Sequence, residues 1–237
     1  MPSLEGKVAI VTGAAGNLGR TVAHALADQG ASVALVDLDP AALEATRAEL
    51  PPGAETATFA ADLIAPESVA GMVEQVLARF GRIDILANIA GGFTMGPLLH
   101  QTEDKDWDFM LDLNARTTFN CCRAVVPSML AGGGGKIVNV SARAATEGKA
   151  RMTPYCAAKA AVITLTQSLA AEHKHAGINV NCILPGTIDT PQNRKAMPDQ
   201  DYAHWVPTTA LADVILFLVS DAAECVTGAA IPVYGRS

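Results

Sequence analysis

Short runs rich in valine and isoleucine alternate along the chain with stretches that have the periodicity of helices. We expect strands at Val8–Val11, Ser32–Val36, Thr56–Ala60, Ile83–Ala87, Lys136–Val140, Asn179–Leu184 and Ala230–Val233. Helices are expected near Leu18–Gln29, Pro40–Leu50, Pro66–Phe80, Glu103–Leu130, Pro154–His173 and Thr209–Ser220. The strands show little polar alternation, which is typical of parallel strands covered on both faces. This order predicts an α/β fold, a doubly wound sheet of about seven parallel strands with helices on both faces.

The composition favours a single soluble domain. Half of the 237 residues are hydrophobic and only 17% are charged, so a large core is available. We find no internal repeat and expect one domain over residues 1–237, with a substrate loop at residues 186–208. A formal net charge of −7 without a basic stripe argues against nucleic acid and anionic membranes as partners.

The first residues and the cysteines bear on the location of the protein. No basic segment followed by an apolar run opens the sequence, so we expect no signal peptide. No apolar stretch approaches the roughly 18 residues that span a bilayer. The five cysteines lack metal-binding spacing and are interpreted as reduced thiols of a cytoplasmic protein. We expect no metal site.

A glycine-rich segment, Thr12–Gly19, follows the first expected strand directly and reads Thr-Gly-Ala-Ala-Gly-Asn-Leu-Gly. Glycines allow a tight turn here and let the backbone approach a pyrophosphate, which then lies at the positive N-terminus of the next helix. A glycine pattern alone is weak evidence, but its place inside a βαβ unit makes it specific. The segment predicts a bound dinucleotide.

Asp37 ends the second expected strand, 18 residues after Gly19. A carboxylate at this position accepts hydrogen bonds from the adenosine ribose and repels a 2′-phosphate. Ala14, Ala15 and Leu38 offer no cation that could neutralise such a phosphate. We therefore expect NAD(H) to be preferred over NADP(H). The alternative is that Asp37 serves only as a cap before Asp39-Pro40.

Tyr155 and Lys159 stand four residues apart in an expected helix, which places both side chains on one face. A phenol with a pKa near 10 exchanges protons poorly at neutral pH, and a neighbouring ammonium favours the phenolate. We therefore expect Lys159 to lower the pKa of Tyr155 toward useful acid–base chemistry. Together with the glycine turn and Asp37, the pair predicts an oxidoreductase.

These motifs resemble those of the short-chain dehydrogenases/reductases, which share a Rossmann-type fold. The family turn TGxxxGxG is close to Thr12–Gly19, its YxxxK matches Tyr155 and Lys159, and its helix asparagine matches Asn114. Further matches are Asp62 after the third strand, the segment Asn88-Ile89-Ala90-Gly91, and PGxxxT at residues 185–190. The resemblance covers nearly the whole chain.

The resemblance implies a role for each matching residue. Tyr155 would be the acid/base, Lys159 would bind the nicotinamide ribose and lower the tyrosine pKa, and Asn114 would hold a water of a proton relay. Asp62 would contact the adenine, while Ile188, through its backbone, and Thr190 would anchor the carboxamide. The implied cofactor-binding set is Gly13, Gly16, Asn17, Leu18, Gly19, Asp37, Asp62, Leu63, Asn88, Ala90, Gly91, Tyr155, Lys159, Pro185, Gly186, Ile188 and Thr190.

Two positions depart from the family pattern. The family serine thirteen residues before the tyrosine, which binds the substrate oxygen, is Ala142 here. Ser141 is one residue away, and neighbouring side chains on a strand point to opposite faces, so it is a doubtful substitute. In the turn, Asn17 stands where the family has glycine, and asparagine tolerates a left-handed backbone better than most residues.

Both departures, together with Ala90–Phe93 and residues 189–207, resemble dihydropteridine reductases, an NADH-using group within the superfamily. Losing one donor from an oxyanion site costs about 2.7–4 kcal/mol, and a quinonoid ring that spreads its charge tolerates this loss better than a simple ketone. We expect hydride transfer between nicotinamide and a small carbonyl, alcohol or quinonoid substrate. The alternatives are a dihydropteridine reductase, a 3-oxoacyl-thioester reductase, and a catalytically silent dinucleotide sensor or scaffold.

The sequence also predicts a substrate pocket and an interface. Ala142, Phe93, Met152 and Trp205 are expected to line the pocket. The resemblance implies that the helices at residues 103–130 and 154–173 pack in a dimer, commonly within a tetramer of 222 symmetry. The candidate apolar contacts are Met110, Leu113, Phe119, Val162 and Leu165.

Overall fold

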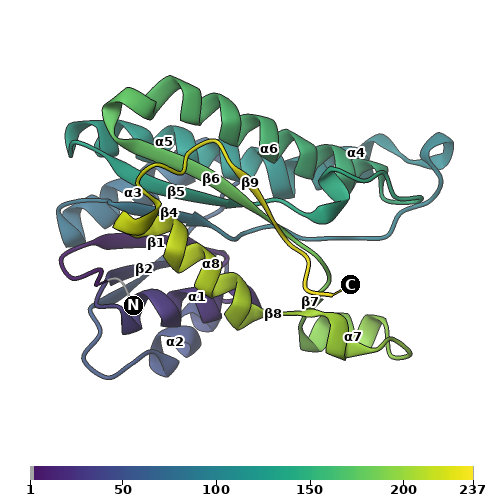
Figure 1. Cartoon of the computed structure of the whole chain (residues 1–237), viewed down its shortest axis with the longest axis horizontal. Coiled ribbons are helices and arrows are strands. Elements are labelled where there is room, and N and C mark those ends of the chain that lie inside the picture. The colour runs from purple at the N-terminus through teal and green to yellow at the C-terminus, as the bar shows by residue number, and fades with distance from the viewer. Residues whose placement is uncertain (1–2, 237) are drawn as a thin grey trace.

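A parallel sheet of seven strands, in the order β3-β2-β1-β4-β5-β6-β9, forms the centre of the molecule (Figure 1). The computed structural model describes residues 3–236. The strands are β1 (Val8–Thr12), β2 (Ser32–Asp37), β3 (Thr56–Ala60), β4 (Ile85–Asn88), β5 (Gly135–Val140), β6 (Ile178–Pro185) and β9 (Ala230–Val233). The carboxyl ends of β1, β2, β4 and β5 meet along one edge of the sheet, because all neighbouring strands run parallel.

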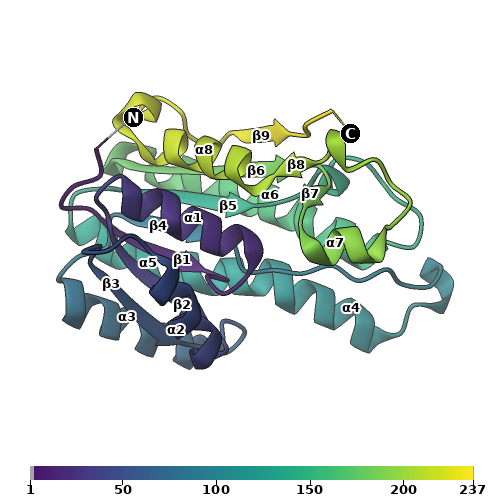
Figure 2. The same cartoon turned by 90° about the horizontal axis from the view of Figure 1, so that it is seen from below.

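Helices cover both faces of this sheet (Figure 2). The helices α1 (Asn17–Asp28), α2 (Pro40–Glu49) and α8 (Thr208–Val219) contribute to the core on one face. On the other face lie α3 (Pro66–Phe80), α5 (Thr117–Ala131) and α6 (Thr153–His173). Alternate residues of β1 enter the two cores: Ala9 and Val11 face α1, whereas Val8 and Ile10 face α3 and α5. The predicted single-domain α/β fold is confirmed.

The long helix expected at residues 103–130 is interrupted. It consists of α4 (Asp104–Leu111), a π-helical turn (Asp112–Arg116) and α5. Asn114 lies in this turn, is fully buried, and donates its side-chain amide to the carbonyls of Met110 and Gly92. The expected helix is present, but the π turn within it was not predicted, because helical periodicity does not reveal a single inserted residue. Such π turns frequently occur at functional sites.

The segment at residues 186–208 has structure that the sequence patterns did not predict. It contains β7 (Ile188–Asp189), α7 (Pro191–Ala196), a 3₁₀ turn (Tyr202–His204) and β8 (Val206–Pro207), which pairs with β7. Arg194 of α7 forms a two-point ion pair with Asp189, at 2.6 and 2.7 Å. Further 3₁₀ turns lie at Leu99–Gln101, Arg143–Ala145, Lys174–Ala176 and Asp221–Ala223.

Burial separates the expected interface residues into two groups. Some of these candidates were expected to face the sheet, and Met110 and Val162, only 2% and 0% exposed, are in the interior and cannot supply intermolecular contacts. Phe119 is 43% exposed and lies on the outer face of α5, while Leu113 and Leu165 are half-buried. Within residues 3–236, no helix is both long and apolar enough to cross a bilayer.

Candidate active site

The glycine-rich turn joins β1 to α1 at the carboxyl edge of the sheet. Gly13 has a φ of 64°, in the left-handed region, and Gly16 is the N-cap of α1 without any side-chain cap. The first N–H groups of α1 therefore have no capping side chain and can bind an anion. Asn17 is the first residue of the helix itself, so the expectation that it tolerates a left-handed backbone has no bearing on the turn.

Close packing fixes the turn against its neighbours. A Cβ at Gly19 would lie 2.0 Å from the carbonyl oxygen of Gly13, so this position requires glycine. The Thr12 hydroxyl accepts hydrogen bonds from the N–H groups of Ile89 and Ala90, at 3.0 and 3.1 Å. Thr12 thus ties the turn to the segment after β4. The sequence motifs did not predict this role of Thr12, although a threonine at the end of a strand before glycine is a usable signal.

Asp37 lies where the second strand ends and faces the turn. Its carboxylate accepts hydrogen bonds from the N–H of Ala15 at 3.0 Å and from the N–H of Leu38 at 2.7 Å. It does not cap the following helix, because the N-cap of α2 is Asp39, so the alternative interpretation of Asp37 was wrong; the carboxylate lies beside the glycine turn instead. Arg20, a cation close to the same turn, is ion-paired with Glu49 at 3.3 Å.

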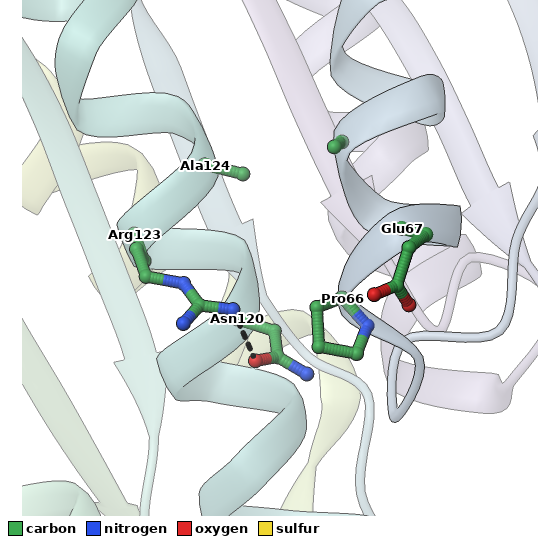
Figure 3. Close-up of a pocket in the computed structure, with 6 residues that line it drawn as sticks. Pro66, Glu67, Asn120, Arg123 and Ala124 are labelled. Atoms are coloured by element: carbon green, nitrogen blue, oxygen red, sulfur yellow. Dashed lines mark hydrogen bonds between the residues drawn. The ribbon is translucent and has the colours of Figure 1, made fainter.

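Asp62 and Leu63 follow β3, next to the end of β2. Asn120 of α5 holds this segment, because its buried amide donates to the carbonyls of Leu63 and Ile64, both at 3.0 Å. Figure 3 shows Asn120 at a groove between α3 and α5, where Arg123 donates to its side-chain oxygen. This cavity of about 330 Å³ is lined by Pro66, Glu67, Ala70, Asn120, Arg123 and Ala124. Neither Tyr155 nor Lys159 lines it.

A buried polar network supports the centre of the carboxyl edge. The Asn88 amide donates to Asn139 at 2.8 Å, and the Asn139 amide donates to the Thr166 hydroxyl at 2.9 Å. The network links β4 through β5 to α6. Asn88 thus connects the strands with the helix that carries Tyr155, while its own side-chain oxygen is buried and lacks a partner.

Tyr155 and Lys159 lie on the first two turns of α6, which begins at Thr153 with Pro154 in its first turn. Lys159 is 5% exposed, and its Nζ donates to the carbonyl of Val140 at 2.9 Å. The same Nζ lies 6.0 Å from the centroid of the Tyr155 ring. The structure therefore brings the predicted pair together, with Lys159 fastened to the end of β5.

Burial dominates the protonation of both groups. It raises the pKa of Tyr155 to about 12, with a smaller contribution from Cys156 in the same direction. Burial also lowers the pKa of Lys159 to about 8, because it disfavours the charged ammonium. In the protein alone the expectation that Lys159 lowers the pKa of Tyr155 is wrong, since burial raises this pKa and Lys159 is not among the causes of its shift. Near neutral pH Tyr155 is a protonated phenol.

Ser141 and Ala142 follow β5 and lie next to α6. The Ser141 hydroxyl is buried and donates to the backbone carbonyl of Lys159 at 2.7 Å. This bond points the hydroxyl at the helix backbone and uses its only proton. Ala142, where the family has its serine, is 7% exposed and offers no donor side chain.

Asn114 completes the cluster around the lysine. Its side-chain nitrogen donates to the Gly92 carbonyl, and its side-chain oxygen accepts from the Gly92 N–H at 3.1 Å. A Cβ at Gly91 would lie 2.7 Å from this oxygen and 3.1 Å from the Lys159 Nζ, so Gly91 leaves room for both groups. The amide of Asn114 thus positions backbone. Its backbone carbonyl accepts from the Thr118 hydroxyl at 2.9 Å, and its part in a proton relay stays a prediction.

Comparison with known proteins agrees with this geometry. Residues 7–201 match the family model described as short chain dehydrogenase. The chain belongs to the short-chain dehydrogenase family. It is 40% identical to D-threitol dehydrogenase of Mycolicibacterium smegmatis, over 98% of this chain and 93% of that protein.

Two further relatives span nearly the same length. The BbsD subunit of (2S)-[(R)-hydroxy(phenyl)methyl]succinyl-CoA dehydrogenase from Thauera aromatica is 38% identical, over 98% of this chain and 96% of that protein. The structure is also similar to that of an NAD⁺-bound xylitol dehydrogenase, with a TM-score of 0.90 and 29% identity over 98% of this chain and 99% of that one.

In this short-chain dehydrogenase, residues 185–190 lead from β6 into the loop segment. Thr190 caps α7, accepting a hydrogen bond from the Asn193 N–H at 3.2 Å, and the Ile188 carbonyl accepts from the Asn193 side chain at 2.8 Å. The Asn17 side chain, at the start of α1, donates to Gln192 of α7. This contact places α7 beside the glycine turn, an arrangement that no sequence pattern indicated.

The expected pocket residues of this short-chain dehydrogenase differ in their surroundings. Phe93 packs edge-on against Tyr155, with ring centroids 5.0 Å apart and an interplanar angle of 73°. Met152 directly precedes α6 and is half-buried. Trp205 is 7% exposed and packs on Tyr202, at 4.7 Å between centroids. Phe93 is thus placed at the phenol, while the lining roles of Met152 and Trp205 stay predictions.

Proposed function

We propose that this protein is an NAD(H)-dependent oxidoreductase that transfers hydride between nicotinamide and a small carbonyl, alcohol or quinonoid substrate. One observation carries the proposal: a half-buried tyrosine and a buried lysine lie on adjacent turns of α6, at the carboxyl end of β5. The glycine-rich turn lies along the same edge of the sheet. A protein that only binds the dinucleotide has no need of a half-buried phenol beside a buried amine.

The residues around the turn fit a dinucleotide. The N-terminus of α1 has no side-chain cap, and the backbone packs too closely at Gly19 for any side chain. When bound, NAD(H) supplies or accepts the hydride. The first N–H groups of α1 hold the pyrophosphate. Asp37 holds the adenosine ribose, and Lys159 holds the nicotinamide ribose.

Asp37 supports NAD(H) over NADP(H). Its carboxylate lies beside the turn through its bond to the Ala15 N–H, so a 2′-phosphate there would meet a negative charge. Arg20, which could offset that charge, is paired with Glu49. The NAD⁺ named for the similar xylitol dehydrogenase agrees with this preference.

Tyr155 exchanges the proton with the reacting oxygen. Its raised pKa keeps the phenol protonated, which is the form that donates during reduction. For oxidation the phenol must first lose its proton, and the ammonium of Lys159 together with a positively charged nicotinamide favours that loss. The related threitol and xylitol dehydrogenases are named for alcohols, which supports an alcohol or carbonyl group as the reacting centre.

The quinonoid alternative rests on the region after β5. Ala142 provides no hydroxyl, and Ser141 donates its hydroxyl to Lys159, so the substrate oxygen has one donor fewer than in the family pattern. A substrate that spreads its charge, such as a quinonoid dihydropteridine, tolerates that loss best. A 3-oxoacyl-thioester reductase is the alternative supported by the relative named for a CoA thioester.

Turnover tests these functions. Purified protein is incubated with NADH or NADPH and a panel of quinonoid acceptors, diketones, simple ketones and 3-oxoacyl thioesters. We expect NADH oxidation with at least one carbonyl or quinonoid class. Tight NADH binding without turnover of any acceptor would contradict the proposal and favour a dinucleotide sensor.

We further propose that the protein is a homo-oligomer that pairs through the outer faces of α5 and α6. Phe119 and Leu130 are 43% and 44% exposed on α5, and small side chains such as Ala161 and Thr164 are exposed on α6. Exposed apolar groups beside a flat helix surface favour association. Light scattering at micromolar concentration should give the mass of a dimer or tetramer, and a mass of 24.5 kDa would contradict this proposal.

A further inference from the structure

The loop between β4 and α4 is fastened at two glycines. Gly92 is held by Asn114, which exchanges two hydrogen bonds with its N–H and carbonyl, both at 3.1 Å. Gly96 is held in the same manner by Arg151, the residue before Met152. The Gly96 N–H donates to the Arg151 carbonyl at 2.9 Å, and the Arg151 Nε donates to the Gly96 carbonyl at 3.1 Å.

Arg151 has an unusual backbone. Its φ of 64° lies in the left-handed region, which residues other than glycine rarely adopt and which costs free energy. Among residues 3–236 it is the only such residue besides glycines. Backbone strain of this kind persists where surrounding contacts hold it, and it is concentrated at functional sites. Here the strained backbone turns both the carbonyl and the side chain of Arg151 toward Gly96.

Phe93 lies between the two fastened glycines. Its ring meets Tyr155 edge-on at 5.0 Å between centroids, although Phe93 itself is 47% exposed. No other described aromatic ring is paired with Tyr155. A half-exposed side chain on a loop keeps such a position only if the backbone on both sides of it is fixed. The backbone at Gly92 is fixed by a residue of the π turn, and the backbone at Gly96 is fixed by Arg151.

We propose that Arg151 is a positioning residue that holds residues 92–96 and thereby keeps the Phe93 ring edge-on against Tyr155, forming one wall of the substrate pocket and limiting the access of water to the phenol. The proposal rests on the proposed function of Tyr155 as the acid/base. The Arg151 guanidinium acts here through the hydrogen bond that its Nε donates to the Gly96 carbonyl, and not through its positive charge.

By covering the phenol, Phe93 would control the protonation of Tyr155. The titratable groups that face the phenol are Lys159, whose Nζ lies 6.0 Å from the ring centroid, and Cys156, which acts on its charge. Burial is the larger cause of the raised pKa of Tyr155. If Phe93 leaves, water reaches the phenol and its pKa falls toward that of a free tyrosine. Removal of a positive charge would move the pKa in the opposite direction.

Three variants test the proposal. Arg151→Gly keeps the left-handed backbone and the carbonyl half of the contact, and it removes the Nε donor. Arg151→Lys keeps a positive charge but has no donor equivalent to Nε. Gly96→Ala is the matched control, because its Cβ would lie 3.6 Å from the Arg151 carbonyl oxygen, an ordinary contact that leaves both hydrogen bonds in place.

The first measurement is hydrogen exchange of the peptide covering residues 91–98, which requires no turnover. We expect about tenfold faster exchange in Arg151→Gly and Arg151→Lys, and no change in Gly96→Ala, because one hydrogen bond is worth roughly this factor. Unchanged exchange in both Arg151 variants would overturn the proposal. Because this readout is independent of catalysis, it stands even if no substrate is found and the proposed function fails.

The second measurement is the ultraviolet absorbance of the phenolate in the protein without cofactor, titrated toward alkaline pH, with the titration of Tyr155→Phe subtracted to isolate Tyr155. An activity profile would not serve, because Lys159, with a pKa of about 8, titrates before Tyr155, with a pKa of about 12. The ionisation of Tyr155 should move to lower pH by about one unit in both Arg151 variants and in Phe93→Ala. Combining Arg151→Gly with Phe93→Ala should give no further shift, since both act through one ring. An ionisation that moves to higher pH in Arg151→Gly alone would show that the charge acts, and an unmoved ionisation would show that no cover was lost. Either result overturns the proposal.

Discussion

The proposed dinucleotide-binding turn and the proposed proton-transfer region around Tyr155 lie on the same edge of one sheet, yet they are built from different kinds of contact. At the turn, most of the groups that would meet the cofactor are backbone N–H groups, and the side chains of Thr12 and Asp37 bind backbone in turn. At the proton-transfer region, side chains that lie far apart in sequence share one buried cluster. There Lys159 binds the carbonyl of Val140, and Ser141 binds the carbonyl of Lys159.

This difference decides how each region responds to substitution. Function at the turn depends mainly on close packing of the backbone. A substitution of one side chain there, such as that of Asp37, should therefore change only the affinity and selectivity for the cofactor. Function around Tyr155 depends on burial, which sets the protonation of two groups at once. We therefore expect the largest effects of single substitutions in the proton-transfer region and smaller, cofactor-specific effects at the turn.

The largest effect should come from Tyr155→Phe. Removing the only proposed proton donor should lower kcat for a simple ketone or alcohol by about 10²–10⁴-fold, the usual contribution of a general acid or base. NADH affinity should change little, because the cofactor is held mainly elsewhere. The matched control is Tyr202→Phe, whose hydroxyl only donates to loop carbonyls at 3.0 and 3.2 Å. Comparable losses of kcat in both variants would remove the distinction between the regions.

Lys159→Met tests whether burial governs the proton-transfer region. The folded pKa of Lys159 is about 8, below the ordinary value of 10.5, so between these pH values the unfolded chain binds more protons. The folded state must therefore gain stability as pH rises through this window. Relative to Lys159→Met, the wild-type free energy of unfolding should rise by about 2 kcal/mol between pH 7 and roughly pH 9.5.

Urea unfolding at the two pH values measures this difference. Exposed Lys174→Met is the control and should follow the wild type. The raised pKa of Tyr155 acts in the opposite direction, but only above about pH 10, where an unfolded tyrosine begins to ionise. If wild type and Lys159→Met change in parallel with pH, Lys159 is not desolvated in the folded protein.

The same contrast explains what the sequence could predict. The alternation of strands and helices along the chain, the glycine turn and the placement of Asp37 follow from local patterns, and the doubly wound fold built on them is confirmed. The spacing of Tyr155 and Lys159 also placed them on one helix face. The direction in which the pKa of Tyr155 shifts could not be predicted, because the desolvation of the phenol depends on distant segments such as the loop that carries Phe93. The hydrogen bond from Ser141 to Lys159 joins residues 18 apart in the sequence and leaves no local pattern.

Asp37→Ala should have an intermediate effect at the turn. Hydrogen bonds to a charged group are worth about 1.5–3 kcal/mol, so the preference for NADH over NADPH in kcat/KM should fall by about 10–100-fold. Asp39→Asn is the control, because Asp39 only caps α2 by accepting from Ala41 and Ala42, and asparagine keeps that capping role. Equal efficiencies with both cofactors in the wild type would contradict the cofactor assignment.

The smallest effect, and the sharpest test of the proton-transfer region, concerns the two residues after β5. Ala142→Ser restores a hydroxyl at the family position, and turnover of a simple ketone should rise by about tenfold, part of the contribution of one oxyanion donor. A delocalised quinonoid acceptor should gain nothing or lose activity, because the new hydroxyl crowds its ring. Ser141→Ala removes a buried bond to Lys159 and should lower the free energy of unfolding by about 1–2 kcal/mol without selective loss of ketone turnover. If instead Ser141→Ala abolishes ketone turnover while Ala142→Ser has no effect, then Ser141 releases the helix carbonyl during the reaction and is the donor. The region after β5 would then be a rearranged form of the family site, and the case for a quinonoid substrate would lose its support.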